Sequence, residues 1–144
     1  LSVRAGYPPQ VKLLDFGIAR LNQDSPGGER LTSPGVALGS PHFMSPEQVA
    51  GRSDVDARAD IYSAGAVLFE ALTGRTPFKG ETAREVMLHV LTESFPSLLS
   101  VAPSLPPALD EVVRRATARD RARRYESAEA FQLALQPFLD AAAL

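Results

Sequence analysis

The chain has 144 residues and carries 15 Lys and Arg against 17 Asp and Glu, which gives a formal net charge of −2. This near balance provides no basic surface for nucleic acid, so we expect no nucleic-acid partner. Cysteine is absent, which excludes disulfide bonds, thiolate metal sites and cysteine nucleophiles.

No segment of the sequence predicts a membrane span or a signal peptide. The longest uncharged run, residues 94–109, carries four prolines, whereas a spanning helix needs about 18 or more apolar residues. We therefore expect no membrane segment in this piece and a cytoplasmic location, with a membrane anchor elsewhere in the protein left open. The first residue is Leu1 and not Met, so we expect the chain to be part of a longer protein.

The first third of the chain predicts a strand and a long loop. Residues 10–14 place Val11 and Leu13 on one face, which predicts a short β-strand. Residues 21–44 contain repeated Pro and Gly, which indicates a long loop. Loops of this length inside compact domains are usually functional or disordered.

The remainder of the chain predicts about four helices, of which residues 57–73 form the most apolar. We expect this helix to be buried on nearly every side, with Gly74 as its C-terminal cap. One face of the helix consists of Ile61, Ala64, Gly65, Leu68 and Leu72. Much of the remaining surface is covered by Ala66, Val67 and Phe69.

The three later helices are predicted from residues that favour helix starts. Thr82 with Glu85 is a capping-box pattern, Pro107 suits a first helical turn, and Ser127 is an N-cap residue. Pro137 is expected to kink or end the last helix because proline lacks the N–H that the helix interior needs.

Asp15, Phe16 and Gly17 directly follow the predicted strand. One interpretation is an Asx turn after the strand, which this three-residue string alone favours. The other is a carboxylate at a strand end that binds a metal ion bridging nucleotide phosphates.

Three later motifs follow this string in a fixed order. They are Gly39-Ser40-Pro41-His42-Phe43-Met44-Ser45-Pro46-Glu47, Asp60-Ile61-Tyr62-Ser63-Ala64-Gly65, and Arg123-Arg124-Tyr125-Glu126-Ser127-Ala128. Together with the helix pattern between them, they resemble the C-terminal lobe of Hanks-type serine/threonine protein kinases, and the bacterial branch in particular. The resemblance extends from Val11 to about Leu139.

The resemblance implies roles for the N-terminal motif and the loop after it. Asp15 would bind Mg²⁺, and Asp15, Phe16 and Gly17 would form part of the ATP site, with ATP and Mg²⁺ as cofactors of the complete kinase. Residues 20–44 would be the activation loop, in which Thr32 and Ser33 are candidate phosphorylation sites. Alternatively, Thr32 and Ser33 are ordinary loop residues.

The resemblance also implies roles for the later motifs. The protein substrate would be received by Gly39, Ser40 and Pro41, where Ser40 keeps the hydroxyl of the usual Thr. Glu47 would form a structural ion pair with Arg124. Asp60 would hold the catalytic-loop backbone, and Gly65 would permit close helix packing. The alternative for the pair is two solvated surface charges, which contribute little to stability.

Two further features are interpreted without a functional role. His42 and His89 share no metal-ligand spacing, so we predict a loop residue and a helix-surface residue. Six arginines lie between residues 114 and 124, and we predict a solvated face with one structural arginine among them.

The predicted fold is mainly α: a protein-kinase-like C-lobe with a short strand, a long activation loop and about four helices. Residues 1–140 would form a partial kinase domain and residues 141–144 a tail. No Gly-rich loop, strand Lys or H-R-D catalytic loop is present, and these are required for phosphoryl transfer. The chain alone is therefore expected to be inactive, and its partners would be a protein substrate and the missing N-lobe and catalytic loop.

Two alternatives to a kinase remain at this stage. One is a non-catalytic kinase-like module that binds peptides or proteins through residues 39–47. The other is an unrelated helical interaction domain in which the motifs occur by chance. The sequence upstream of Leu1 would distinguish the first alternative from a kinase. The second would be distinguished by whether Glu47 and Arg124 lie together or far apart and exposed.

Overall fold

The computed structural model describes residues 40–142. By its internal contacts the chain divides into a unit Leu1–Gly39 and a unit Ser40–Leu144, and all of the described residues lie in the second. Several predicted features lie outside the described residues: the strand at 10–14, Asp15, Phe16 and Gly17, the loop residues Thr32 and Ser33, and Gly39.

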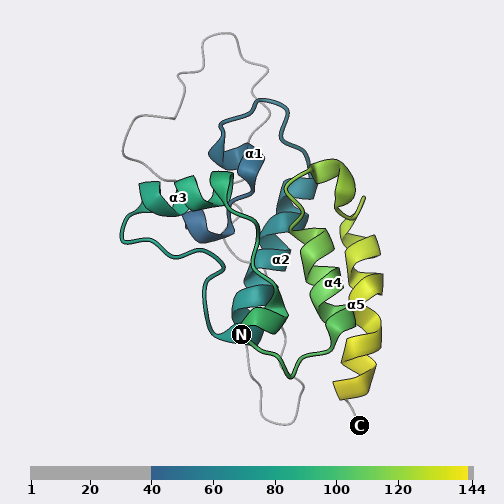
Figure 1. Ribbon diagram of the computed structural model, residues 1–144. Helices are drawn as coiled ribbons and strands as arrows, with labels where there is room; N and C mark the ends of the chain where they lie inside the picture. The colour runs from purple at the N-terminus through teal and green to yellow at the C-terminus, as the bar shows by residue number, and fades with distance from the viewer. Residues whose placement is uncertain (1–39, 143–144) are drawn as a thin grey trace, which may run out of the picture. The chain divides into compact units, whose positions relative to one another are not determined.

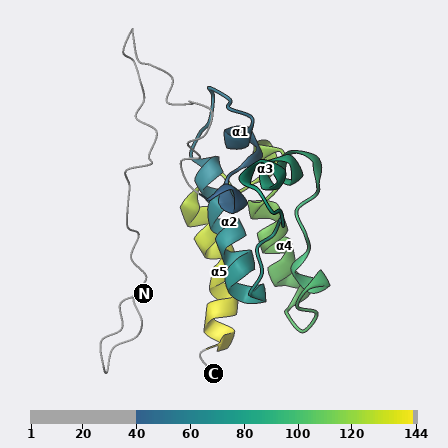
Figure 2. The ribbon, with the colours of Figure 1, turned by 90° about the vertical axis from the view of Figure 1, so that its left-hand side faces the viewer.

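The described residues are mainly α-helical, as predicted, and contain no β-strand. The elements are η2 (Pro41–Phe43), α1 (Pro46–Val49), α2 (Arg58–Thr73), α3 (Ala83–Thr92), η3 (Leu98–Ser100), α4 (Pro107–Ala116), η4 (Arg121–Arg123) and α5 (Ala128–Ala142), where η marks a 3₁₀ helix. Helices α2, α4 and α5 lie side by side (Figures 1 and 2), and α3 lies on the other side of α2 from α4 and α5, next to α1 (Figure 1).

Helix α2 ends as the sequence predicts, but it is not buried on every side. Gly74 follows it with φ 68°, the left-handed conformation that glycine adopts without steric cost. Ala64 is exposed and Val67 is 51% exposed, so the prediction of nearly complete burial is wrong. The apolar composition indicates that a helix tends to be buried, but it does not show which sides have a neighbour among the described residues.

The starts of α3 and α5 are stabilised by side chains, as predicted. Thr82 Oγ1 accepts a hydrogen bond from the Glu85 amide at 3.2 Å. The Glu85 carboxylate accepts from the Glu81 amide at 2.8 Å, one residue earlier than a capping box predicts. Ser127 Oγ accepts from the Ala130 amide at 3.1 Å. Each bond satisfies a backbone N–H that has no partner within its helix.

Helix α5 continues through Pro137 to Ala142, so of the two predicted effects of the proline, a kink or an end, the end does not occur. Pro137 has no N–H to donate to the preceding turn, which costs a helix one hydrogen bond. Leu135 and Phe138, on either side of the proline, both pack against the core. We infer that this packing keeps the segment helical despite the lost bond.

The described residues form three buried apolar clusters, and Phe95 packs against two of them. The ring of Phe95 makes edge-to-face contacts with Tyr62, Phe69 and Phe78 at centroid distances of 5.9, 5.4 and 5.7 Å. Such aromatic pairs add stability beyond the apolar area that they bury. The segment between α3 and α4 therefore contributes directly to the core.

Candidate functional site

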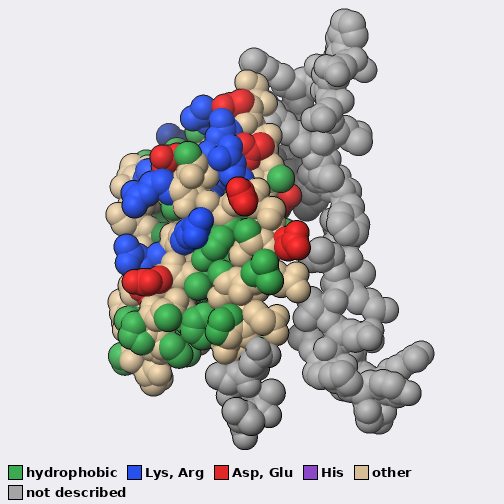
Figure 3. Space-filling model, turned by 90° about the vertical axis from the view of Figure 1, so that its right-hand side faces the viewer, with side chains coloured by type: hydrophobic (Ala, Val, Ile, Leu, Met, Phe, Trp, Pro, Cys, Tyr) green, Lys and Arg blue, Asp and Glu red, His purple; other side chains and the backbone are tan. Residues whose placement is uncertain are grey.

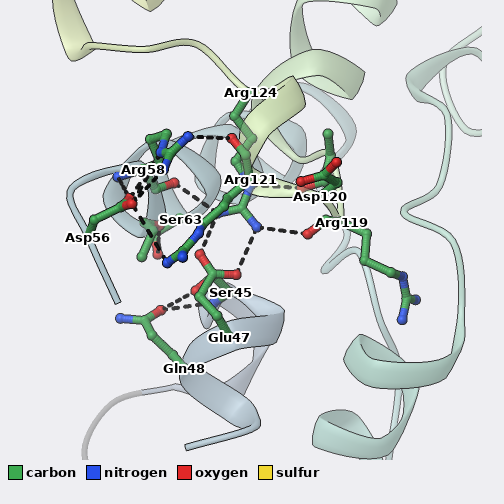
Figure 4. Close-up of polar contacts among 12 residues, drawn as sticks. Ser45, Glu47, Gln48, Asp56, Arg58, Ser63, Arg119, Asp120, Arg121 and Arg124 are labelled. Carbon is green, nitrogen blue, oxygen red and sulfur yellow. Dashed lines mark hydrogen bonds and ion pairs between the residues drawn. The ribbon is translucent and has the colours of Figure 1, made fainter. Parts of the chain in front are cut away.

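Glu47 and Arg124, predicted to pair, form a buried two-point ion pair. Arg124 Nη1 lies 2.6 Å from Glu47 Oε1, and Arg124 Nη2 lies 2.8 Å from Glu47 Oε2. The side chain of Arg124 is fully buried and that of Glu47 is 6% exposed. The two residues are 77 positions apart in the sequence, so the pair links α1 to the segment before α5 (Figure 4).

The remaining N–H groups of Arg124 bind backbone carbonyls. Nε donates to Ala118 at 2.7 Å, Nη1 donates to Arg58 at 3.0 Å, and Nη2 donates to Arg119 at 3.3 Å. The guanidinium also lies over the ring of Tyr62, 5.0 Å from its centroid. All five donors of the guanidinium are thus used. One side chain therefore connects α1, the start of α2 and the turn between α4 and η4.

The short helix α1 positions Glu47 for this contact. Ser45, which is fully buried, precedes α1, and both its amide and its hydroxyl bind Gln48 Oε1, at 2.9 and 3.0 Å. Burial tends to raise the pKa of Glu47, but the hydrogen bonds from Arg124 and from backbone amide groups outweigh it. The pKa of Glu47 consequently lies below its ordinary value, and Glu47 is ionised at neutral pH.

The structure describes Ser40 and Pro41 of the predicted docking segment, and the two residues that follow them, His42 and Phe43, are held by hydrogen bonds. The Phe43 carbonyl accepts a hydrogen bond from Ser63 Oγ in α2 at 2.7 Å. His42 Nδ1 donates a hydrogen bond to the Phe78 carbonyl at 3.0 Å. His42, which we predicted to be a loop residue without a structural role, therefore links η2 to the segment before α3. Ser40 is exposed, and its hydroxyl makes no hydrogen bond within residues 40–142.

Asp60 lies at the start of an exposed stripe of α2. It is exposed, and its carboxylate makes no hydrogen bond or ion pair with the described part of the chain. Ala64, Val67 and Ala71 follow at helical spacing on the same side and are also exposed. A central helix thus presents an apolar stripe and a carboxylate to one side that no described residue covers.

Gly65 is buried where α2 crosses the end of α4. A Cβ atom at this position would lie 2.8 Å from Thr117 Cγ2 and 3.0 Å from Ala116 Cβ. Both distances are shorter than ordinary van der Waals contacts. The close approach of the two helices thus requires glycine here, which agrees with the packing role that the resemblance implies.

More of the arginines are structural than the single one that we predicted. Arg119 donates to the carbonyls of Leu91 and Glu93. Arg121 pairs with Asp54, Nη2 to Oδ2, at 2.6 Å. These contacts join residues that are 26 to 67 positions apart in the sequence, so no local sequence pattern predicts them.

The face formed by α4, α5 and the turns above them bears mixed charge. Lys and Arg side chains gather over its upper part with Asp and Glu among them, and apolar side chains cover its lower part (Figure 3). The guanidinium of Arg115 lies over the ring of Tyr125, 4.3 Å from its centroid. Acidic groups thus interrupt the arginines of this face.

Asp110 is a buried carboxylate that the sequence analysis did not identify. Its Oδ1 accepts hydrogen bonds from the Ser97 hydroxyl at 2.9 Å and the Leu98 amide at 2.6 Å. Asp110 thereby fixes the segment between α3 and α4, which carries the core residues Phe95 and Leu98.

The described residues contain neither a cluster of metal-binding side chains nor a helix suited to span a membrane. Within residues 40–142, no three His, Cys, Asp or Glu side chains are grouped closely enough to hold a metal. No described helix is both long and apolar enough to cross a lipid bilayer. The expected Mg²⁺ ligand Asp15 lies outside the described residues.

Comparison with known proteins relates this arrangement to protein kinases. A probable serine/threonine-protein kinase PknB from Lactococcus lactis is 42% identical over 119 residues, which are 83% of this chain and 18% of that protein. PknL from Mycobacterium tuberculosis is 40% identical over 134 residues, which are 93% of this chain and 32% of that protein. PrkC from Bacillus subtilis is 39% identical over 131 residues, which are 91% of this chain and 19% of that protein. The chain thus spans between about a fifth and a third of the length of these curated relatives.

A solved structure supports the same fold. The twitchin kinase region from C. elegans matches with a TM-score of 0.56 and 23% sequence identity, over 66% of this chain and 16% of that chain. Residues 4–137 match the protein-family description "Protein kinase domain". That match covers most of the chain, which therefore belongs to the protein kinase family.

Proposed function

We propose that this chain forms the C-terminal part of the catalytic domain of a serine/threonine protein kinase. The complete enzyme would transfer the γ-phosphate of ATP to Ser or Thr of protein substrates. Residues 1–140 would belong to the catalytic domain and residues 141–144 would be a tail. Because the reaction consumes ATP, we expect this domain to act in the cytoplasm.

The observation that carries the proposal is the buried pair of Glu47 and Arg124. A random pair of charges on an unrelated helical domain would lie in solvent and contribute little. Here both groups are buried, the contact is made at two points, and every donor of the arginine is used. The pair joins the end of the proposed activation loop to the last helices, as expected for a segment that must be held in one position.

The exposed stripe of α2 supports a larger catalytic domain around this chain. Val67 is 51% exposed in the middle of the central helix, and exposed apolar surface favours a covering partner. Asp60 begins the same stripe, so its carboxylate is available to groups that cover it. We propose that the catalytic loop lies on this side and that Asp60 holds its backbone.

The proposed cofactors depend on residues outside the described part of the chain. Protein kinases in general use ATP and a divalent metal ion, which neutralises charge on the phosphates. The described residues do not form a metal site, so the proposal for Mg²⁺ and ATP rests on Asp15, Phe16 and Gly17. Thr32 and Ser33 are proposed phosphorylation sites, and Gly39, Ser40 and Pro41 a proposed docking segment for the protein substrate.

The test compares this chain with the full-length protein encoded by the reading frame that contains it. Each is incubated with ATP, Mg²⁺ and a generic protein substrate, and the phosphorylated amino acids are identified. We expect phosphoserine or phosphothreonine from the full-length protein and no transfer from the 144-residue chain. Transfer by the chain alone, or none by a folded full-length protein, would contradict the proposal. The second of these results would favour a non-catalytic binding module.

A further inference from the structure

We propose that Arg119 is a positioning residue that holds α3 against the docking segment and thereby acts on protein-substrate binding. This inference rests on the proposed kinase function, because it concerns the segment that would receive the substrate. Neither the sequence motifs nor the comparisons assign any role to Arg119.

Helix α3 has only a small apolar contact with the core. Of its ten residues, Val86 and Val90 alone are buried, and they form a cluster with Phe78. Leu88, in contrast, is 57% exposed. A helix held by two buried side chains gains little stabilisation from packing, so polar contacts at its ends carry more weight than usual.

Arg119 supplies such a contact at the C-terminal end of α3. Its guanidinium donates to the carbonyls of Leu91 and Glu93, and the last carbonyls of a helix have no partner within it. A positive charge is also favoured at this end by the helix dipole. The Glu93 carboxylate is engaged by His89 Nδ1 at 2.6 Å, so Arg119 binds the backbone of Glu93 and not its side chain.

The turn that carries Arg119 is itself fixed by the buried ion pair. The Arg119 carbonyl accepts a hydrogen bond from Arg124 Nη2 at 3.3 Å, and the same nitrogen binds Glu47 Oε2 at 2.8 Å. The backbone of Arg119 therefore has a defined position from which its side chain reaches α3 (Figure 4). A solvated arginine on a mobile turn could not provide this anchor.

The other side of α3 faces the docking segment. Both η2 and α1 contact α3, and Val49 of α1 packs against the cluster of Phe78, Val86 and Val90. The Phe78 carbonyl, in the segment that leads into α3, accepts the hydrogen bond from His42 Nδ1 at 3.0 Å. A displacement of α3 would consequently disturb η2, which begins at Pro41 of the proposed docking segment.

The test uses the full-length protein and three variants. R119A removes the anchor, and R119K keeps the charge but loses the planar fork that binds two carbonyls at once. R123A is the matched control, because Arg123 is exposed and its side chain makes no polar contact within the described residues. Steady-state kinetics are measured separately for the protein substrate and for ATP.

We expect R119A to raise the KM for the protein substrate by about fivefold, the effect of losing roughly one ordinary net hydrogen bond. In R119A the kcat and the KM for ATP should stay within about twofold of wild type. The KM of R119K for the protein substrate should lie between those of wild type and R119A, and R123A should match wild type in all three constants. Equal KM values for R119A and R123A would overturn the inference, as would a loss of kcat alone. An inactive wild-type protein would instead overturn the proposed function.

Hydrogen exchange provides a second readout that needs no activity. In R119A the amides of α3 should exchange faster, while those of α2 and α5 keep their protection. If R119A does not fold, the exchange rates of R119K are compared with those of wild type, and a smaller increase is expected in α3. Unchanged exchange in α3 of a folded variant would contradict the anchoring role.

Discussion

Truncation of either partner of the buried pair should destabilise the chain strongly. Removing one member of a buried ion pair costs about 3–5 kcal/mol, because the other charge is left without compensation. R124A should lie at the upper end, since three backbone carbonyls lose their donor together with Glu47. E47A should lie at the lower end, because Arg124 keeps those three carbonyls. Either loss is a large part of the stability of about 5–15 kcal/mol that is typical of a domain.

The assay is a double-mutant cycle by urea unfolding, followed by circular dichroism, with E47A, R124A and the double variant. The double variant should cost about 2–3 kcal/mol less than the sum of the single variants, because the stranded charge is no longer present. E47Q and R124K provide milder versions in case R124A is largely unfolded. Single effects below about 1 kcal/mol that simply add would refute the reasoning, since they are typical of a surface pair.

The same pair gives a pH dependence with a definite sign. The pKa of Glu47 is lower in the folded chain than its ordinary value of 4.5, so the unfolded chain binds the proton more readily. The stabilisation from this group is complete above the ordinary pKa and is lost as the pH falls through the folded pKa. E47Q should therefore show a smaller loss of unfolding free energy than wild type on acidification. Parallel curves for the two proteins would contradict the pairing.

Two further predictions concern the packing of α2 against α4 and the ion pair of Arg121 with Asp54. G65A should destabilise the chain by about 1–2 kcal/mol, because the overlap of its Cβ with Thr117 Cγ2 outweighs the gain in helix propensity. Adding T117S to G65A should restore part of the lost stability. A G65A variant that is more stable than wild type in thermal unfolding would contradict the close contact. R121A should raise the pKa of Asp54, which the hydrogen bonds from Arg52 and Arg121 hold well below its ordinary value. An NMR titration that finds the same pKa in R121A and wild type would show that the contact is not kept in solution.

The helices were predictable because the residues that start and end them act locally. Thr82 and Ser127 each bind an amide three residues further along the chain, and Gly74 relieves a backbone conformation that other residues adopt at a cost. These interactions depend on a few neighbouring residues, so a short sequence pattern contains them. Pro137 is the exception, because tertiary packing decided the outcome there.

The candidate site was predictable only where residues lie in ordered motifs. Glu47 and Arg124 were identified from such motifs, although they are 77 positions apart. Arg119 was missed because its acceptors are backbone carbonyls, which every residue carries and no residue type marks. Asp110 was missed for the same reason, since one of its donors is the Leu98 amide. The exposure of Val67 depends on which neighbours surround α2, and apolar composition does not specify those neighbours.

The central claim is most directly tested by phosphate transfer in the full-length protein that contains this chain, with D15N as the comparison. Wild type should transfer phosphate from ATP to Ser or Thr of a protein substrate in the presence of Mg²⁺. D15N should remain folded and lose transfer by at least about 100-fold, because the carboxylate expected to hold the metal ion is replaced by a neutral amide. Equal transfer by D15N and wild type, or no transfer by folded wild-type protein, would contradict the assignment.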